Sequence, residues 1–205
     1  SKKALDAGDS VGSILDEAEQ SIFSLTEQKD SKIYQHIEPI LSSTVKRIED
    51  MAANPGSIIG VPSGIIDLDK LTAGFQNGDL IIVAGRPSMG KTALATNIAF
   101  HAAKKIQESE KEKGSVAFFS LEMSSEQLST RILAEQSRIK SNDIRRGKIS
   151  EEQLEQFIET SKNISELPLY IDETPAISIA ALSNRARRIK RLHGLDMIVI
   201  DYIQL

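Results

Sequence analysis

The sequence contains no cysteine, and this absence excludes several kinds of protein. Without cysteine there are no disulfide bonds, no thiol nucleophile and no cysteine-ligated zinc or iron–sulfur site. No apolar stretch approaches the roughly 20 residues that a helix needs to cross a bilayer, and no signal-peptide core follows the first residues. The histidines are only three, His36, His101 and His193, without the spacing of metal ligands. We therefore expect a soluble, cytoplasmic protein with no membrane partner.

Positive charge is also in short supply. The 25 Lys and Arg residues are outnumbered by 29 Asp and Glu residues, which gives a formal net charge of −4. This balance argues against a protein that coats nucleic acid through a general positive charge, but it leaves a local basic face open. Apolar residues make up 40% of the 205 positions, so the chain can bury a core. We expect one domain of ordinary size with an appendage.

The appendage is the region 1–54, whose pattern is helical only. Apolar residues recur at helical spacing over about 13–28 and again over about 31–53, where Pro39 interrupts the pattern. Two amphipathic helices without strands make a poor domain. We expect them to bury their apolar stripes against the following domain or against another copy of it. The segment 54–57 reads as a hinge, so the second domain is predicted to cover 55–205.

Strand and helix patterns alternate through the second domain. Strands are predicted at 80–84, 115–121, 169–171 and 197–200, and helices at 92–106, 125–136, 151–163 and 179–192. The unbroken apolar run 80–84 is typical of a strand that is covered on both faces of a parallel sheet. Ser150 and Gln153 match a capping box at the start of the third of these helices. The alternation predicts a three-layer α/β fold with a mainly parallel sheet.

The strongest signal is a phosphate-binding loop of the form G-x-x-x-x-G-K-[ST]. It consists of Gly85, Arg86, Pro87, Ser88, Met89, Gly90, Lys91 and Thr92. It stands between a predicted strand and a predicted helix, which is the setting that the motif requires. Its glycines let consecutive N–H groups face one concavity, and the helix adds the positive end of its dipole. Lys91 can reach the β- and γ-phosphates, and the Thr92 hydroxyl can bind Mg²⁺. We predict binding of a nucleoside triphosphate.

Three further residues are candidates for the same site. Asp201 ends an apolar strand, where a carboxylate can hold Mg²⁺, although a strand-terminal turn residue is the alternative. Glu122 directly follows the strand 115–121 and can orient the attacking water or simply cap the next element. Gln204 can sense the γ-phosphate or merely end a strand. For these last two residues, the pattern alone leaves both interpretations open.

The helix predicted at 179–192 carries a basic cluster of Arg185, Arg187, Arg188, Lys190 and Arg191. These residues occupy the outer face of an amphipathic helix, where solvated charge is the default. Contact with nucleic-acid phosphates, or with the acidic surface of a neighbouring subunit, is the alternative.

The motifs together resemble one family closely, the bacterial replicative DNA helicases of the DnaB type, within the RecA-like ATPases. The resemblance covers almost the whole chain. It rests on the segment 60–71, on Gly78-Asp79-Leu80, on the loop interior Arg86-Pro87-Ser88-Met89-Gly90, and on the signatures at 118–123 and 200–205.

This resemblance implies a RecA-like P-loop core that is preceded by a linker helix, the helix at 13–28. It implies ATP and Mg²⁺ as cofactors, with Glu122 and Lys91 as catalytic residues, Thr92 and Asp201 as magnesium ligands, and Gln204 as γ-phosphate sensor. Such helicases work as ring-shaped homo-hexamers in which the linker helix packs on the adjacent subunit. The ring translocates on single-stranded DNA and unwinds the duplex at a replication fork. Primase and a helicase loader are the further partners implied.

Two departures from the family pattern limit the expected activity. The family's N-terminal helical domain is missing, and the chain stops at Leu205, just past the strand that ends at Asp201. The resemblance places a further strand, the DNA-contacting loops and the arginine finger downstream, and such a finger contributes about 10³–10⁵ in turnover. We therefore expect the 205-residue chain alone to be nearly inactive. The alternatives are a RecA-type recombinase and a non-hydrolysing, ATP-dependent assembly or clamp protein.

Overall fold

The computed structural model describes residues 16, 19–20, 36–53, 58–109 and 113–202. By its internal contacts the chain divides into two compact units, residues 1–55 with 179–185 and residues 56–178 with 186–205. Of the helix predicted at 13–28, only residues 16, 19 and 20 are described, and all three are helical. Gln204 lies outside the described residues. The domain boundary between 54 and 55 stays a prediction.

The described part of the first unit contains one long helix, α2 (Ile37–Ala53). Pro39 lies in its first turn, where an N–H group has no partner within the helix, so the helix continues through it without interruption. The large apolar side chains of α2 are between 38% and 61% exposed: Ile37, Ile40, Leu41, Val45, Ile48 and Met51. The sequence predicts that this apolar stripe is buried against the following domain or against another copy of it.

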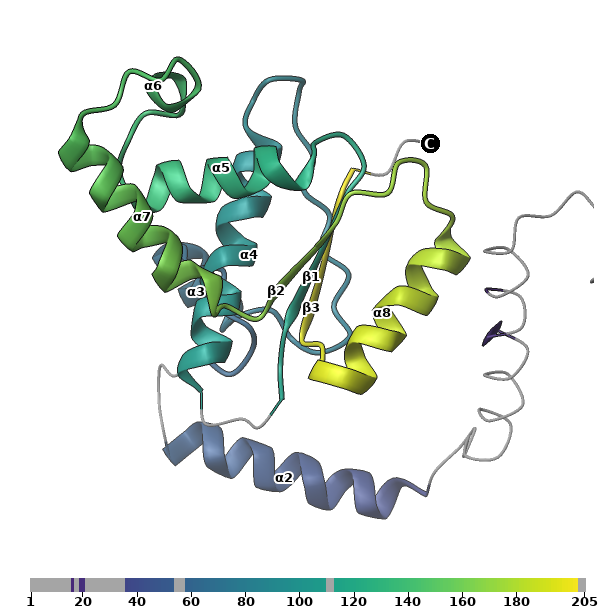
Figure 1. Cartoon of the computed structure of the whole chain (residues 1–205). Coiled ribbons are helices and arrows are strands. Elements are labelled where there is room, and N and C mark those ends of the chain that lie inside the picture. The colour runs from purple at the N-terminus through teal and green to yellow at the C-terminus, as the bar shows by residue number, and fades with distance from the viewer. Residues whose placement is uncertain (1–15, 17–18, 21–35, 54–57, 110–112, 203–205) are drawn as a thin grey trace, which may run out of the picture. The chain divides into compact units, whose positions relative to one another are not determined.

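The second unit is built on a parallel sheet of three strands in the order β2–β1–β3. The strands are β1 (Val116–Ser120), β2 (Leu169–Asp172) and β3 (Met197–Asp201). Val116 pairs with Leu169 on one side and with Met197 on the other. In Figure 1, helices α4 (Lys91–Glu108), α5 (Ser125–Gln136) and α7 (Glu151–Ser165) lie on one side of the sheet. Residues 186–193 of α8 (Ile179–His193) lie on the other. The predicted layered α/β architecture is confirmed.

The core forms where α4 packs on the central strand. All five residues of β1 are buried, since strands flank it on both edges and helices cover both faces of the sheet. The buried core cluster consists of Ala99, Ala102, Ala103, Val116, Phe118 and Leu128. Three of its members are alanines of α4, and their small side chains let the helix backbone approach the sheet closely. Helix α4, whose first residue is Lys91, is therefore packed firmly on the sheet through its second half.

Helix starts follow the sequence closely. Ser150 and Gln153 form the predicted capping box of α7, and Ser124 with Gln127 forms a second one at α5. Two short helices were not predicted, α3 (Ile66–Thr72) and α6 (Ser141–Arg145). Elements of seven and five residues are too short to show an apolar period. No helix among the described residues is long and apolar enough to span a membrane.

The prediction of a buried strand at 80–84 is wrong. These residues form no strand, and Leu80 and Ile82 are 86% and 80% exposed. An apolar run becomes a strand only when a neighbouring strand supplies hydrogen-bond partners, and the described part of the sheet ends at β3. In the fold that the chain resembles, a further strand separates this segment from β3. None of the elements described up to Tyr202 supplies that strand.

Candidate functional site

The predicted phosphate loop is an exposed turn that leads directly into α4. Ser88 and Gly90 both have left-handed backbone conformations, with φ of 64° and 88°. The Met89 N–H donates to the Arg86 carbonyl at 3.3 Å, which closes the turn. No side chain caps α4 at Gly90, and no acidic residue lies in its first turn. The N–H groups and the positive dipole end of an 18-residue helix are thus open to an anion.

Lys91 is held between the loop and the end of β3. A Cβ added to Gly85 would lie 3.4 Å from Lys91 Cγ, so the aliphatic part of the lysine runs close to this glycine. The Nζ atom lies 5.1 Å from the ring centroid of Tyr202, the residue after β3, within the range of a cation–π contact. The lysine charge therefore sits where the phosphate loop meets the carboxyl end of β3.

Asp201 is the last residue of β3 and is only 5% exposed. Its Oδ2 atom is buried and accepts no hydrogen bond from the described residues. Buried carboxylate oxygens almost always have a partner, so an unpartnered one fits a metal ligand. Thr92, in the first turn of α4, carries the hydroxyl that the motif assigns to Mg²⁺, and oxygen donors are what Mg²⁺ prefers. Thr92 and Asp201 thus carry oxygen atoms of the kind that Mg²⁺ takes as ligands.

No alternative metal centre competes with this pair in the described part of the chain. There, no group of three or more His, Asp or Glu side chains gathers closely enough to hold an ion.

Glu122 leaves the sheet beside Asp201. The Leu121 N–H donates to the Asp201 carbonyl at 2.8 Å, which extends the β1–β3 pairing by one residue beyond Ser120. The Ser120 hydroxyl donates to the Met123 carbonyl at 2.6 Å and accepts from the Met123 N–H at 3.1 Å. These bonds fix a tight turn from which the exposed Glu122 projects. The structure thus brings Glu122 and Asp201 to one edge of the sheet, the edge that Lys91 also reaches.

Glu173 is a residue of this edge that sequence reasoning missed. It follows β2, and its carboxylate accepts a hydrogen bond from the Ser125 N–H at the start of α5. Hydrogen bonding from Ser125 holds the pKa of Glu173 below its usual value, because these bonds favour the ionised carboxylate. The rule that selected Glu122, an acid directly after a predicted strand, would have selected Asp172, because the strand was predicted only at 169–171. The observed β2 includes Asp172 and leaves Glu173 as the first residue after the strand.

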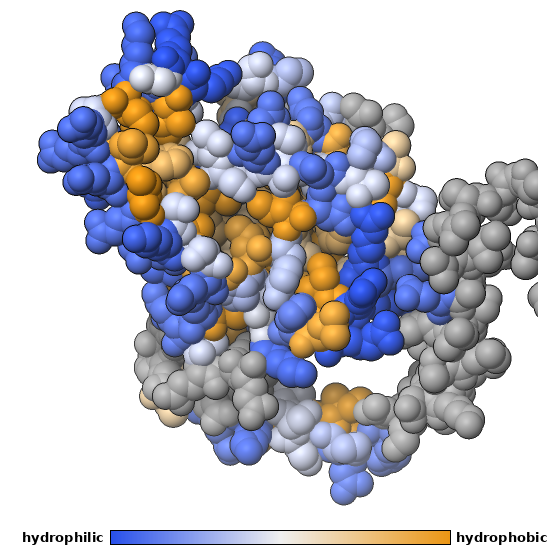
Figure 2. All heavy atoms as spheres, in the orientation of Figure 1, coloured by the Kyte–Doolittle hydropathy of each residue, from blue (hydrophilic) through white to orange (hydrophobic). Residues whose placement is uncertain are grey.

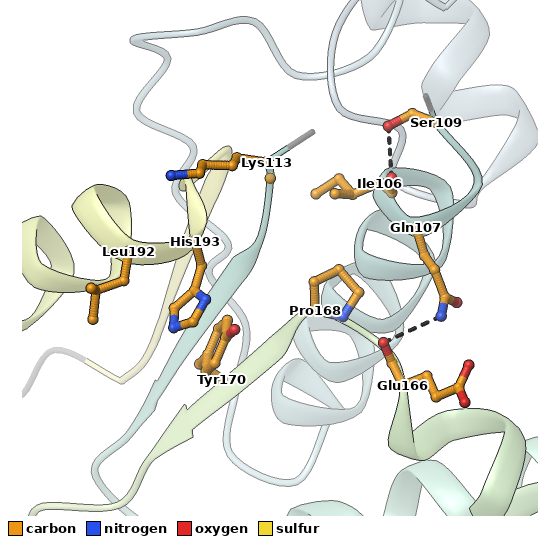
Figure 3. A pocket seen from close by; sticks show the side chains of 10 residues that line it. Ile106, Gln107, Ser109, Lys113, Glu166, Pro168, Tyr170, Leu192 and His193 are labelled. Atoms are coloured by element: carbon orange, nitrogen blue, oxygen red, sulfur yellow. Dashed lines mark hydrogen bonds between the residues drawn. The ribbon is translucent and has the colours of Figure 1, made fainter. Parts of the chain in front are cut away.

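A separate pocket of about 340 Å³ opens at the other edge of the sheet, where β1 and β2 begin (Figure 3). Tyr170 and His193 stack there, with ring centroids 4.8 Å apart. Gln107 Nε2 donates to the Glu166 carbonyl at 3.2 Å across the opening. None of the predicted site residues lines this pocket, so it is distinct from the phosphate loop.

A parallel sheet with a phosphate loop before a helix, and acids after adjacent strands, defines the class of RecA-like α/β ATPase domains. Residues 60–205 match the family model described as the DnaB-like helicase C terminal domain. The chain belongs to this family.

Curated relatives of the chain agree with that assignment. The replicative DNA helicase DnaC of Bacillus subtilis is 42% identical over 197 residues, and the replicative DNA helicase DnaB of Geobacillus stearothermophilus is equally similar. Each match covers 96% of this chain but 42% of the relative, so the chain spans about two fifths of the relatives' length.

Solved structures share the fold. A solved ATPase domain superposes on this chain with a TM-score of 0.73 at 27% sequence identity. The match covers 85% of this chain and 58% of the solved chain. A DnaB-like replicative helicase, described together with its interactions with primase, gives a TM-score of 0.67 at 26% identity. That match covers 89% of this chain and 43% of the helicase.

Proposed function

We propose that this chain is the nucleotide-binding part of a replicative DNA helicase that uses ATP and Mg²⁺. The observation that carries the proposal is the meeting of three features at one edge of the sheet. They are the uncapped start of α4, the Lys91 ammonium beside Tyr202, and the buried, unpartnered oxygen of Asp201. Family membership supplies the class of reaction.

Each predicted site residue has one role in this proposal. The loop 85–90 and Lys91 bind the phosphates of ATP, and Thr92 with Asp201 holds Mg²⁺. When bound, the ion neutralises charge on the β- and γ-phosphates. Glu122 orients the water that attacks the γ-phosphate, and its exposure at the sheet edge leaves room for that water. Gln204 senses whether the γ-phosphate is present.

The assembly belongs to the proposal as well. Subunits form a homo-hexameric ring around single-stranded DNA at a replication fork, with primase and a helicase loader as further partners. The exposed apolar stripe of α2 supports assembly, because a stripe of this kind needs a covering surface. The recombinase alternative is disfavoured by the family assignment. The non-hydrolysing alternative is separated from the helicase by Glu122, as described in the Discussion.

Binding of a fluorescent ATP analogue to this chain, with and without Mg²⁺, tests the nucleotide site directly. We expect Lys91→Ala to weaken binding at least tenfold, since it removes the charge that faces the phosphates (about 1.4 kcal/mol or more). Lys113→Ala is the matched control, because Lys113 lines the separate pocket at the opposite edge.

The two variants distinguish the outcomes. Weaker binding by the Lys91 variant together with unchanged binding by the Lys113 variant supports the proposal. The reverse pattern would place the nucleotide in the other pocket and refute it.

A further inference from the structure

A compact cluster of cations at the turn between α5 and α7 is not used by the proposed nucleotide site. We call residues 138–148 the basic tip. It holds five cations and one acid, Asp143, in a chain whose formal net charge is −4. The cations are Arg138, Lys140, Arg145, Arg146 and Lys148, and all of them are exposed. Figure 2 shows this region as deep blue atoms at the top of the molecule, where Figure 1 labels α6.

The basic tip is free of neutralising partners within the described structure. The ion pairs His36–Glu38, Asp67–Lys70 and Lys105–Glu108 all lie outside the tip. The side chains of its five cations make no ion pair or hydrogen bond with another described residue. Surface lysines and arginines that are left unpaired and close together repel one another, so the tip favours an anionic partner.

The backbone of the tip is held in place by hydrogen bonds and by one buried side chain. Ile139 is 5% exposed and anchors the segment in the core. The Arg146 N–H donates to the Asn142 carbonyl at 3.2 Å, and the Lys148 N–H donates to the Asp143 carbonyl at 2.9 Å. Gly147 reverses the chain with a left-handed φ of 63°. A partner therefore meets cations on a preformed scaffold, and binding requires little ordering of the backbone.

We propose that the basic tip binds the backbone phosphates of a nucleic-acid strand, without reading its sequence. The inference rests on the proposed function, which makes nucleic acid the polyanion that the chain meets. Arginine matches phosphate with a planar fork of donors, and three of the five cations are arginines. The basic cluster of α8 is a weaker candidate, because Arg185 and Arg187 already have interaction partners.

The tip is connected to the nucleotide site through α5. This helix starts after Ser124, two residues from Glu122, and its 12 residues end shortly before Arg138. At 1.5 Å per residue it is about 18 Å long. Phosphates on the tip would therefore lie one rigid helix away from Glu122, outside the ATP site itself.

The test is the salt dependence of binding to a labelled oligo-dT strand. The variant Arg145→Gln/Arg146→Gln/Lys148→Gln removes three cations from the tip. Each phosphate contact contributes about 0.7 to the slope of log affinity against log salt. Loss of the tip contacts should therefore lower the slope by about 2 and weaken binding about tenfold near physiological salt. The control Lys104→Gln/Lys105→Gln/Lys162→Gln removes the same charge from exposed positions on α4 and α7.

A smaller slope for the tip variant alone supports the proposal. Equal slopes for the unchanged protein and the tip variant would overturn it, as would an equal loss in both variants, which would reflect net charge. Reduced binding of an acidic polyglutamate peptide, with unchanged binding of oligo-dT, would assign the tip to a protein partner and also overturn it. If the unchanged protein binds ATP but no oligo-dT, the proposal for the basic tip fails while the proposed nucleotide site stands. Failure to bind ATP would instead count against the proposed function, so the two failures are distinguishable.

Discussion

Single residues of the proposed nucleotide site lack the hydrogen-bond partners or caps that such groups usually have. Asp201 lacks a hydrogen-bond partner for a buried oxygen, and Gly90 lacks a side chain that would cap α4. Unmet donors and acceptors are costly inside a protein, so they mark the places where a ligand can bind. Glu122 differs from both, because it is exposed and free to act on water.

Replacement of Glu122 separates binding from hydrolysis. In the assembled enzyme, Glu122→Gln should keep the affinity for ATP within about threefold and cut hydrolysis by about 100-fold or more, because the amide cannot accept the water's proton. Binding of a fluorescent ATP analogue and release of phosphate measure the two quantities. A non-hydrolysing assembly protein would function equally well with this change, so undiminished function would favour that alternative.

Asp69 illustrates a residue whose role is structural. Its buried carboxylate accepts hydrogen bonds from the Ser63 N–H and hydroxyl, both at 2.7 Å, and from the Gly64 N–H at 3.1 Å. Asp69→Ala leaves these donors unmet and should lower the free energy of unfolding by about 3 kcal/mol.

Urea unfolding measures the effect, and Asp67→Ala is the control on the same helix. Asp67 makes an exposed ion pair with Lys70 at 3.6 Å, so its loss should change stability by less than about 1 kcal/mol. Similar losses for the two variants would contradict the assigned role of Asp69.

Glu173 gives a prediction about pH. Its pKa in the folded state is lowered by hydrogen bonding from Ser125, so the folded state favours the ionised carboxylate. The resulting stabilisation is present at pH values above the pKa of the unfolded state, and it is lost as the pH falls through the lower pKa of the folded state. Glu173→Gln should therefore destabilise the protein at pH 7, and the difference from the unchanged protein should shrink on acidification.

Urea unfolding at neutral and acidic pH tests this trend. Glu159→Gln, an exposed position within α7, supplies the comparison. A difference between Glu173→Gln and the unchanged protein that stays constant with pH would show that the carboxylate charge is not involved.

At the scale of elements, the helix starts carry measurable stability. The capping box of α7 pairs the Ser150 hydroxyl with the Gln153 N–H at 3.2 Å, and the Gln153 side chain with the Ser150 N–H at 3.0 Å. Ser150→Ala should lower the free energy of unfolding by about 1 kcal/mol. Ser161→Ala, at an exposed position within the same helix, should be neutral or stabilise by about 0.5 kcal/mol. A loss at Ser161 equal to that at Ser150 would contradict the capping role.

The elements also show what sequence can predict. The strand at 115–121 and the helices at 125–136 and 151–163 were found because their apolar periods and caps are local properties. The same reasoning failed at 80–84, because pairing depends on a neighbour that lies far away in the sequence. The placement of Lys91 and Asp201 at the carboxyl ends of the strands could be predicted from the sequence, because their motifs are local. The contact of Lys91 with Tyr202 could not, because it depends on how α4 sits against β3.

For the whole molecule, the exposed apolar segments predict self-association. Leu80 and Ile82 are 86% and 80% exposed, and Ile198 of β3 is 44% exposed. Exposed apolar segments and open strand edges recruit other chains. Leu80→Lys/Ile82→Lys should therefore reduce aggregation of this chain, measured by light scattering against concentration, and should leave the midpoint of thermal unfolding nearly unchanged. A large drop in that midpoint would mean that the segment is packed in solution.

The register of β3 has a consequence for how this segment tolerates insertions. Along β3 the side chains alternate between less and more exposed positions, and Asp201 pairs with Ser120 at the edge. One residue inserted within β3 would turn the aspartate toward the opposite face and leave an isoleucine in its place. Two inserted residues would restore the face but lengthen the strand by about 7 Å. Homologous chains that keep this chemistry should therefore vary in length around the strand and almost never within it.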